Sequence, residues 1–290
     1  MVEDGDDASD ERRLMGEKRR RTTVYVAGEL GLVRVDVAAA QVGQYTLIER
    51  GSCLSVATSG DAVVVGTDEH VSVLDGDELR PIGFGPTTAV GIDEDCIYAA
   101  SPAGRVARLA RTRLDESTGS NSQSLPWESV GSVDGARTFD GDLLATEAGL
   151  FRVDSEDGLV SLGLEEARDV TRFGPIGATA AGVFQLEAGD WQREVDGDAT
   201  AVVTRSESAH AIVDGNVLER SPDGNWQPVQ PPTESEPRLL AYSPTLTVLT
   251  ADGTVWISAD PEITHDGHGG WRSQAIGVPD ATEMAVRHDT

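Results

Sequence analysis

The sequence predicts an all-β fold: a seven-bladed β-propeller of four-stranded antiparallel blades, with a ring closed by a C-terminal strand that pairs into the N-terminal blade. Three observations predict it. An apolar hairpin occurs seven times, with a glycine at its turn in six copies, and a second strand-like segment also occurs seven times. The two ends of the chain each lack the part of a blade that the other end carries.

The seven hairpins share an apolar run, a short turn and a second apolar run. Alternating apolar residues on both sides of a glycine are typical of a β-hairpin whose turn needs a positive φ angle. From Gly31 to Gly253 the glycine recurs about every 37 residues, and a period of about 20–50 residues indicates a solenoid, propeller or array. The glycines are Gly31, Gly104, Gly149, Gly182, Gly215 and Gly253, with His70 near this place in the second copy.

A second apolar segment precedes each hairpin by about ten residues and supplies a first strand. It ends in a turn signal such as Ser59-Gly60-Asp61. A shorter segment after the hairpin, such as residues 78–82, supplies a fourth strand. A ring of six or eight blades is the alternative, because the interval between Gly104 and Gly149 stretches to 45 residues. The first-strand copies begin at Ser52, Thr87, Gly135, Glu166, Asp198, Glu236 and Asp280.

The chain ends are complementary. The first unit begins directly with its hairpin at Val24, whereas the copy from Ala281 has no hairpin after it. Pairing of residues 281–288 into the first blade would close the ring and leave no open end for aggregation. A linear array would instead need capping units. One segment, LGLEEARDVTR from Leu162, also fits a short amphipathic helix.

The charge is strongly negative. Fifty acidic and 23 basic side chains give a formal charge of −27, and Lys18 is the only lysine. A nucleic-acid binder needs a basic surface, so this class is excluded. A membrane span needs about 18 consecutive apolar residues, which the sequence lacks. Near-absence of lysine with abundant carboxylates indicates a halophilic protein, whose self-repulsion is screened by salt.

The first 21 residues are charged and have no apolar core of a signal peptide. We therefore expect a disordered charged tail over residues 1–21 and a single β-propeller domain over residues 22–290. With no export signal and only Cys53 and Cys96 as cysteines, the expected location is the cytoplasm. The expected oligomeric state is a monomer.

Two long insertions, residues 111–126 and 258–270, fall between third and fourth strands and thus on one face of the ring. The first is polar and is interpreted as a flexible bulge. The second holds oxygen and imidazole donors, so a cation or ligand loop is one hypothesis, with a metal-stabilised structural protein as its consequence. Their spacing matches no established ligand pattern, and no metal site and no cofactor are predicted. These donors are Asp260, His265, Asp266 and His268.

Four tryptophans stand where a fourth strand begins: Trp127, Trp191, Trp226 and Trp271. Residues 221–226, SPDGNW, look like a shortened Asp-box, a structural hairpin in which the tryptophan anchors the turn and the aspartate caps it. No nucleophile elbow, P-loop, dinucleotide fingerprint or zinc motif is present, so no catalytic residue is assigned. His210 and His288 are interpreted as packing or surface residues.

Residues 22–290 resemble an uncharacterised haloarchaeal β-propeller family. The resemblance rests on TTVYVAGELGLVRV (Thr22 to Val35), the acidic glycine hairpins and the segment from Ser258 to Asp280. It implies the same fold and a cytoplasmic, halophilic setting, and it carries no activity and no catalytic residues over to this chain.

The sequence therefore favours a non-catalytic interaction or ligand-binding platform, with an unidentified protein or small-molecule partner and no nucleic acid or membrane. The alternative is a hydrolase or lyase acting on a carbohydrate-like substrate. That alternative requires two or more carboxylates about 5–10 Å apart that face the central channel, one with a raised pKa. A channel lined by small apolar side chains would exclude it.

Overall fold

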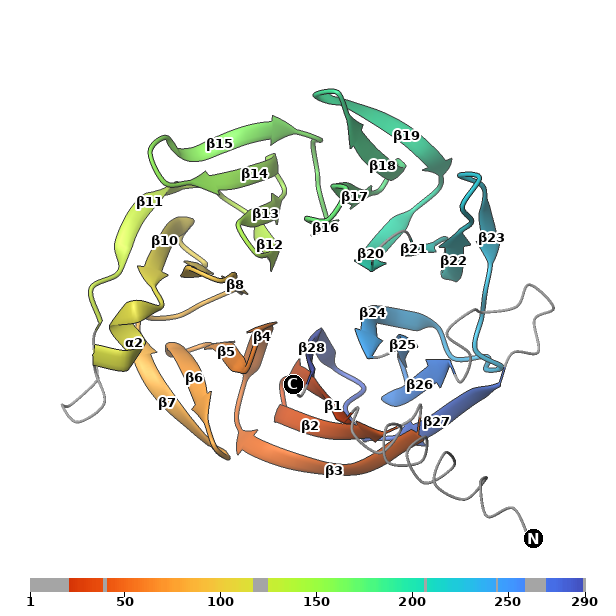
Figure 1. Ribbon diagram of the computed structural model, residues 1–290, viewed down its shortest axis with the longest axis horizontal. Coiled ribbons are helices and arrows are strands. Elements are labelled where there is room, and N and C mark those ends of the chain that lie inside the picture. Colours follow the sequence, from red (N-terminus) through yellow and green to blue (C-terminus); the bar gives the residue numbers. More distant parts are fainter. Residues whose placement is uncertain are drawn as a thin grey trace, which may run out of the picture.

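The computed structural model describes residues 21–38, 41–116, 125–205, 208–243, 245–258 and 270–288. Over these residues the chain forms seven four-stranded antiparallel sheets arranged as blades around a central axis (Figure 1). The predicted fold and blade number are confirmed, and the six- and eight-bladed alternatives are wrong.

In each blade the first-named strand is the innermost and the last-named strand is the outermost. Blade 1 has β28 (Ala281–His288), β1 (Arg21–Gly28), β2 (Gly31–Ala38) and β3 (Gln41–Arg50); blade 2 has β4 (Cys53–Ser59), β5 (Ala62–Thr67), β6 (Val71–Asp75) and β7 (Glu78–Gly83); blade 3 has β8 (Ala89–Ile92), β9 (Cys96–Ala100), β10 (Arg105–Ala110) and β11 (Glu128–Ser132). Blade 4 has β12 (Ala136–Asp140), β13 (Leu143–Thr146), β14 (Gly149–Asp154) and β15 (Gly158–Gly163); blade 5 has β16 (Asp169–Thr171), β17 (Ile176–Thr179), β18 (Gly182–Glu187) and β19 (Asp190–Asp196). Blade 6 has β20 (Ala199–Arg205), β21 (Ser208–Val213), β22 (Asn216–Arg220) and β23 (Trp226–Pro228); blade 7 has β24 (Pro237–Ser243), β25 (Thr245–Thr250), β26 (Thr254–Ser258) and β27 (Trp271–Ala275).

The ring is closed as predicted. Strand β28 pairs antiparallel with β1, with Tyr25 opposite Ala285 and Val26 opposite Met284. The strand that ends the described chain therefore provides the innermost strand of the first blade. Closure in this way places both ends of the described chain in one blade, where backbone hydrogen bonds join them.

The recurring hairpin glycines have the backbone conformation that the sequence predicts. Gly31 has a φ angle of 132°, and a Cβ atom there would lie 1.8 Å from the carbonyl oxygen of Glu49. Any other residue at this turn would collide with the neighbouring strand. The hairpin turn thus explains why a glycine recurs in nearly every blade.

The hydrophobic core lies between adjacent blades. One cluster joins Val24 and Val35 of blade 1 to Leu249 and Ile257 of blade 7. Other clusters repeat this arrangement around the ring, since each sheet is covered by the next. Small residues permit the closest approach: a Cβ atom on Gly91 of β8 would lie 2.6 Å from the Cβ atom of Phe139.

The alternative helix over residues 162–172 does not form, because Leu164 and Glu166 have positive φ angles of 54° and 53° and lie between β15 and β16. The first strand expected after Glu166 is present as β16. In the first insertion, expected to be a flexible bulge, the described part opens with a short helix, α2 (Thr112–Glu116). Both insertions connect a third to a fourth strand, as predicted. No helix within the described ranges is long and apolar enough to span a bilayer.

Candidate functional site: the central cavity

The innermost strands surround a cavity of about 560 Å³ on the ring axis. Small-molecule sites in proteins typically measure about 300–1,000 Å³. The lining is mixed: carboxylates, arginines, threonine hydroxyls and aromatic rings stand among aliphatic side chains. The charged lining residues are Arg137, Asp140, Arg168, Asp169, Arg205 and Glu283.

The innermost strand of each blade has a sheet neighbour on one side only, so its free edge faces the axis (Figure 1). Its backbone N–H groups need partners when water is excluded. Side chains of the preceding blade supply them at three places. The amide of Val56 donates to Glu283 Oε2 (2.8 Å), that of Val90 to Ser55 Oγ (2.9 Å) and that of Val202 to Asp169 Oδ2 (2.9 Å).

Glu283 joins three blades. It starts from β28 in blade 1 and accepts hydrogen bonds from Val56 and from the hydroxyl of Ser55 in blade 2. Its other oxygen, Oε1, accepts from the hydroxyl of Thr138 in blade 4, at 2.9 Å. Burial in the ring raises the pKa of the Glu283 carboxyl to about 7, against the lowering effect of these hydrogen bonds.

Asp169 and Asp140 have the same kind of environment. Burial raises the pKa of Asp169 to about 7, although the amides of Val202 and Val170 both donate to it. Burial also raises the pKa of Asp140, which accepts a hydrogen bond of 2.7 Å from the amide of Arg172. The negative charge of Asp140 raises the pKa of Asp169 further, and Asp169 does the same to Glu283. The three acids therefore form one electrostatically connected group.

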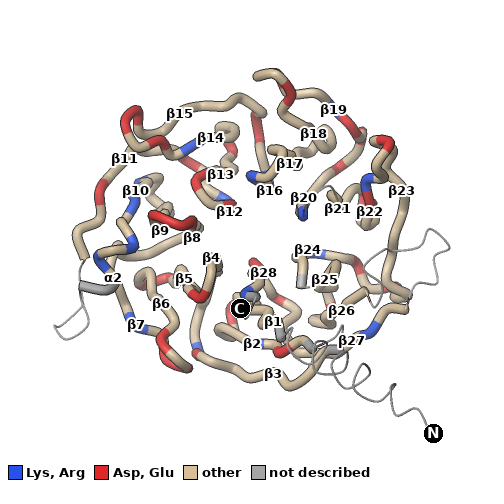
Figure 2. The backbone as a smooth tube through the Cα atoms, in the orientation of Figure 1, with Lys and Arg blue, Asp and Glu red and all other residues tan. Residues whose placement is uncertain are grey.

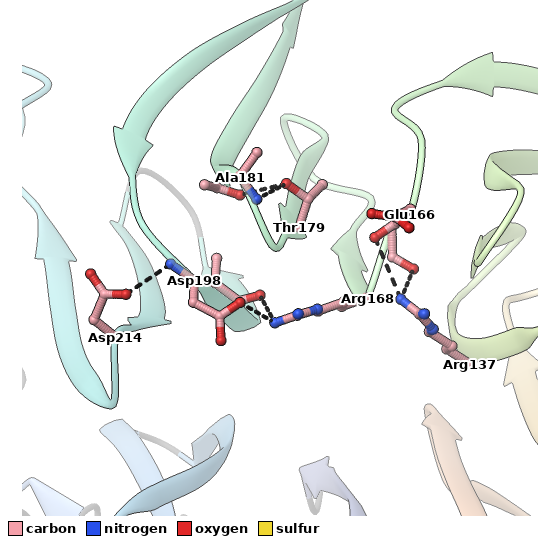
Figure 3. A network of polar contacts seen from close by, with 10 residues as sticks. Arg137, Glu166, Arg168, Thr179, Ala181, Asp198 and Asp214 are labelled. Atoms are coloured by element: carbon pink, nitrogen blue, oxygen red, sulfur yellow. Dashed lines mark hydrogen bonds and ion pairs between the residues drawn. The ribbon is translucent and has the colours of Figure 1, made fainter.

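Two arginines connect blades where the first strands begin (Figure 3). Arg137 donates to the carbonyl oxygen of Ala167 (3.2 Å), and Arg168 donates to Asp198 Oδ1 (2.7 Å) and to the carbonyl oxygen of Ala199 (3.3 Å). Asp198 is itself fixed, because its amide donates to Asp214 at 2.9 Å. Guanidinium groups thus reach from blade 4 to blade 5 and from blade 5 to blade 6.

Basic residues line the cavity as often as acidic ones, although the molecule as a whole is acidic. In Figure 2, Lys and Arg segments mark the inner ends of β12, β16 and β20, while many acidic segments lie further out. At the other ends of these strands, the guanidinium of Arg172 stacks on the ring of Phe173 at 4.8 Å. Phe173 is 63% exposed and also lines the cavity, as does Arg205. The cavity thus has a cationic and aromatic rim.

The loop residues proposed from the sequence lie outside the described part of the chain: Asp260, His265, Asp266 and His268. The loop hypothesis therefore stays a prediction. Among the described residues no group of three or more His, Cys, Asp or Glu side chains could hold a metal ion. His210 is a packing residue as expected: it is buried, contacts the Tyr242 hydroxyl at 2.5 Å and has a pKa lowered to about 3 by desolvation.

Sequence reasoning missed the three channel acids. The available signal was an ionisable residue inside an apolar first strand, as Glu283 in ATEMAVRH and Asp169 in EARDVTR. Carboxylates line the cavity, so the condition that would exclude the hydrolase hypothesis, a lining of small apolar side chains, is not met. Their oxygens, however, accept hydrogen bonds from the ring itself.

The tryptophans that begin fourth strands connect blades at the outer side. The indole N–H donates to the preceding blade in three cases: Trp127 to the Ile82 carbonyl (3.0 Å), Trp191 to the Leu162 carbonyl (2.7 Å) and Trp226 to Glu194 Oε2 (2.9 Å). The indole N–H thus joins one blade to the next. In the turn interpreted as an Asp-box, the Asp223 carboxylate accepts hydrogen bonds from the side chains of Ser221 and Asn225.

The fold and its cavity define a closed seven-bladed β-propeller with a polar axial site. The chain belongs to the HVO_0234-like β-propeller family, whose model matches residues 8–287. The resemblance to a haloarchaeal β-propeller family is thereby confirmed. A search of the curated proteins found no match.

Solved structures similar to this chain are varied propellers. The computationally designed Ika8 protein has a TM-score of 0.60 and 15% identity, over 90% of this chain and 86% of that chain. Apo AztD from Citrobacter koseri has a TM-score of 0.58 and 9% identity, over 93% and 99%. YCF48 bound to D1 peptide has a TM-score of 0.55 and 12% identity, over 79% and 84%. Identities this low show the fold alone.

Proposed function

We propose that this protein is a non-catalytic binding platform that holds a small, negatively charged, polar molecule in the central cavity. The observation that carries the proposal is the lining itself. Three arginines and several threonine hydroxyls face a cavity of about 560 Å³ in a chain whose formal charge is −27. The three carboxyls in the same lining have raised pKa values, which reduces their negative charge near neutral pH. Guanidinium groups in such a site recognise carboxylate or phosphate groups.

The channel acids support binding rather than catalysis. A general acid or base must offer a free oxygen or proton to the substrate. Both oxygens of Glu283 and both oxygens of Asp169 accept hydrogen bonds from protein groups. These side chains accept hydrogen bonds from backbone amides at the inner edges of the strands, so their first role is to join neighbouring blades.

The entrance that we favour is the rim with Phe173 and Arg205, because both residues line the cavity and Phe173 is largely exposed there. An exposed aromatic ring beside guanidinium groups offers both an apolar surface and positive charge. In line with the halophilic composition, we propose that binding takes place in a salt-rich cytoplasm.

The test is binding measured by thermal shift and calorimetry at constant high ionic strength. The probes are citrate, glucuronate and inorganic phosphate, with glucose as the neutral control. Arg205→Gln should weaken binding of the anionic probe about tenfold, as expected for the loss of one charge-assisted contact. Arg193→Gln makes the same charge change on the outer strand β19 and should leave binding unchanged. Equal binding of glucose and anions, or equal effects of the two variants, would refute the proposal.

A second candidate function, hydrolysis of a carbohydrate-like substrate, is favoured by one observation: Asp169 and Glu283 in one cavity both have a pKa of about 7. This value suits a general acid at neutral pH. Release of nitrophenol from nitrophenyl glycosides by the wild type, and its loss in folded Glu283→Gln, would support it. No turnover by the wild type would leave the binding platform as the function.

A further inference from the structure

Strand β3, the outermost strand of blade 1, has an unusual surface. Large exposed apolar side chains in the described chain are Leu30, Tyr45, Leu47 and Phe173, and two of them lie on this strand. Tyr45 is 49% and Leu47 40% exposed. Residues 41–48 contain no charged side chain. A long, apolar, uncharged sheet edge is a template for pairing with another chain.

Tyr45 and Leu47 continue two apolar rows that cross the whole blade. One row runs from Val286 through Val24 and Val35 to Tyr45. The parallel row ends at Leu47, which pairs with Val33. Both rows start in the core and reach the edge of the sheet without a polar residue. Cross-strand contacts of this kind stabilise a sheet, and at β3 they stop for lack of a further strand.

In three other blades a row that reaches the outer strand through an aromatic residue ends in a polar residue. Phe151 of blade 4 pairs with Ser161, Phe184 of blade 5 with Arg193 and Trp256 of blade 7 with Ser273. Of these three, the charged Arg193 discourages edge pairing. Among the described outer strands β3 is also the longest, with ten residues, whereas the next longest, β19, has seven.

We propose that β3 pairs antiparallel with β3 of a second copy of this chain, across a twofold axis at Thr46, in contrast to the monomer expected from the sequence. The regular stretch of β3 is 45–47, because the pairing with β2 is irregular on both sides of it. A twofold axis at Thr46 sets each Tyr45 opposite the Leu47 of the other copy, and the two Thr46 residues opposite each other. Aromatic–aliphatic and Thr–Thr pairs are favourable cross-strand neighbours.

The charge of the chain is compatible with a second copy as the partner of β3 when the salt concentration is high. Two molecules of formal charge −27 repel each other, and an uncharged stretch is where two copies can approach. The repulsion is screened when the Debye length falls to about 3 Å at 1 M salt. The dimer therefore strengthens as KCl rises. This inference does not depend on the function proposed for the cavity.

The first experiment is sedimentation equilibrium of the full chain in 3 M KCl. We expect a monomer–dimer equilibrium in the wild type, and a dissociation constant raised about tenfold or more by Tyr45→Glu, which alters two symmetric contacts. Ser161→Glu places the same charge on the outer strand β15 and should leave the equilibrium unchanged. A wild type that stays monomeric at millimolar concentration, or a dimer indifferent to Tyr45→Glu, would overturn the proposal.

The second experiment tests the register. Directly opposed residues have Cβ atoms about 4.5–5.5 Å apart, so Thr46→Cys should form an intermolecular disulfide on mild oxidation. Gln44→Cys is the control, because four residues of offset would separate the two sulfur-bearing positions by about 13 Å. Cross-linking of Thr46→Cys no faster than that of Gln44→Cys would refute the pairing.

Discussion

Carboxylates occupy two contrasting regions of this molecule, the axial cavity and the surface turns. In the cavity, burial raises the pKa values of Asp169 and Glu283 to about 7. At the turns, hydrogen bonds lower the pKa values of Asp154 and Asp252. Asp154 accepts from the amides of Glu156 and Asp157 without leaving water. In both regions the carboxylates accept hydrogen bonds from backbone amides or hydroxyls. The ionised form of the carboxyl is disfavoured in the cavity and favoured at the turns.

The difference teaches how an acidic chain uses its carboxylates. Surface acids keep their hydration, so their cost is mutual repulsion, which salt screens. Cavity acids lose hydration, and salt in the bulk does not restore it. We therefore expect salt to act on the surface acids and pH near neutrality to act on the cavity acids.

The largest expected effect is that of salt. Below about 0.5 M KCl the unscreened surface charge should unfold the protein, and structure should return as salt rises. Circular dichroism and melting temperature against KCl concentration measure this. Native signal and unchanged melting in dilute buffer would contradict it.

Removing the Glu283 carboxyl should have the next largest effect. Glu283→Ala leaves the Val56 amide and the hydroxyls of Ser55 and Thr138 without their acceptor, which should cost about 2–4 kcal/mol of unfolding free energy. Asp154→Ala at a surface turn is the matched comparison and should cost about 1 kcal/mol or less. Denaturant unfolding at constant salt gives both values, and equal losses would remove the distinction between the regions.

The pH dependence of stability sharpens the comparison. A carboxyl with a raised pKa binds its proton more tightly in the folded state, so its stabilising contribution is present below about pH 4 and is lost as pH rises to about 7. The lowered pKa values of Asp154 and Asp252 contribute stability that is lost as the pH falls below about 4. Stability should fall from about pH 5 to about pH 8, and Glu283→Gln should flatten this fall. An unchanged slope in Glu283→Gln would contradict the raised pKa.

The smallest expected effect is at the outer side of the ring. Trp226→Phe removes the indole donor to Glu194 and should cost about 1 kcal/mol beyond the change in packing. Trp256→Phe is the control, because the buried indole nitrogen of Trp256 has no hydrogen-bond partner among the described residues. A loss in Trp226→Phe no greater than in Trp256→Phe would show that the link between blades contributes nothing.

The fold was predictable because its signals are local and repeated. Gly31 and the later hairpin glycines each mark a turn, and the incomplete unit at Val24 requires the strand from Ala281. Because the blade unit repeats, the same assignment of strands and turns applies to all seven blades. The irregular path of residues 162–172 was not predictable from periodicity, since the positive φ angles at Leu164 and Glu166 depend on packing between blades.

Only some of the residues that line the cavity could be predicted from the sequence. Ionisable residues in apolar strands mark Asp169 and Glu283, but a strand pattern does not show which edge faces the axis. The contact from Glu283 to Thr138 joins residues 145 positions apart, and only the closed ring brings them together. The arginines at the two ends of the cavity likewise require the curvature that places Arg137, Arg168 and Arg205 around one axis.

The most direct test is a double-mutant cycle between Glu283 and Thr138. Unfolding free energies of Glu283→Ala, Thr138→Val and the double variant are measured at constant high salt. If the carboxyl of the closing strand bonds across the axis, the two substitutions should be coupled by about 1 kcal/mol or more. Additive losses would mean that Glu283 does not join blade 1 to blade 4, and the account of the channel acids as links between blades would be wrong.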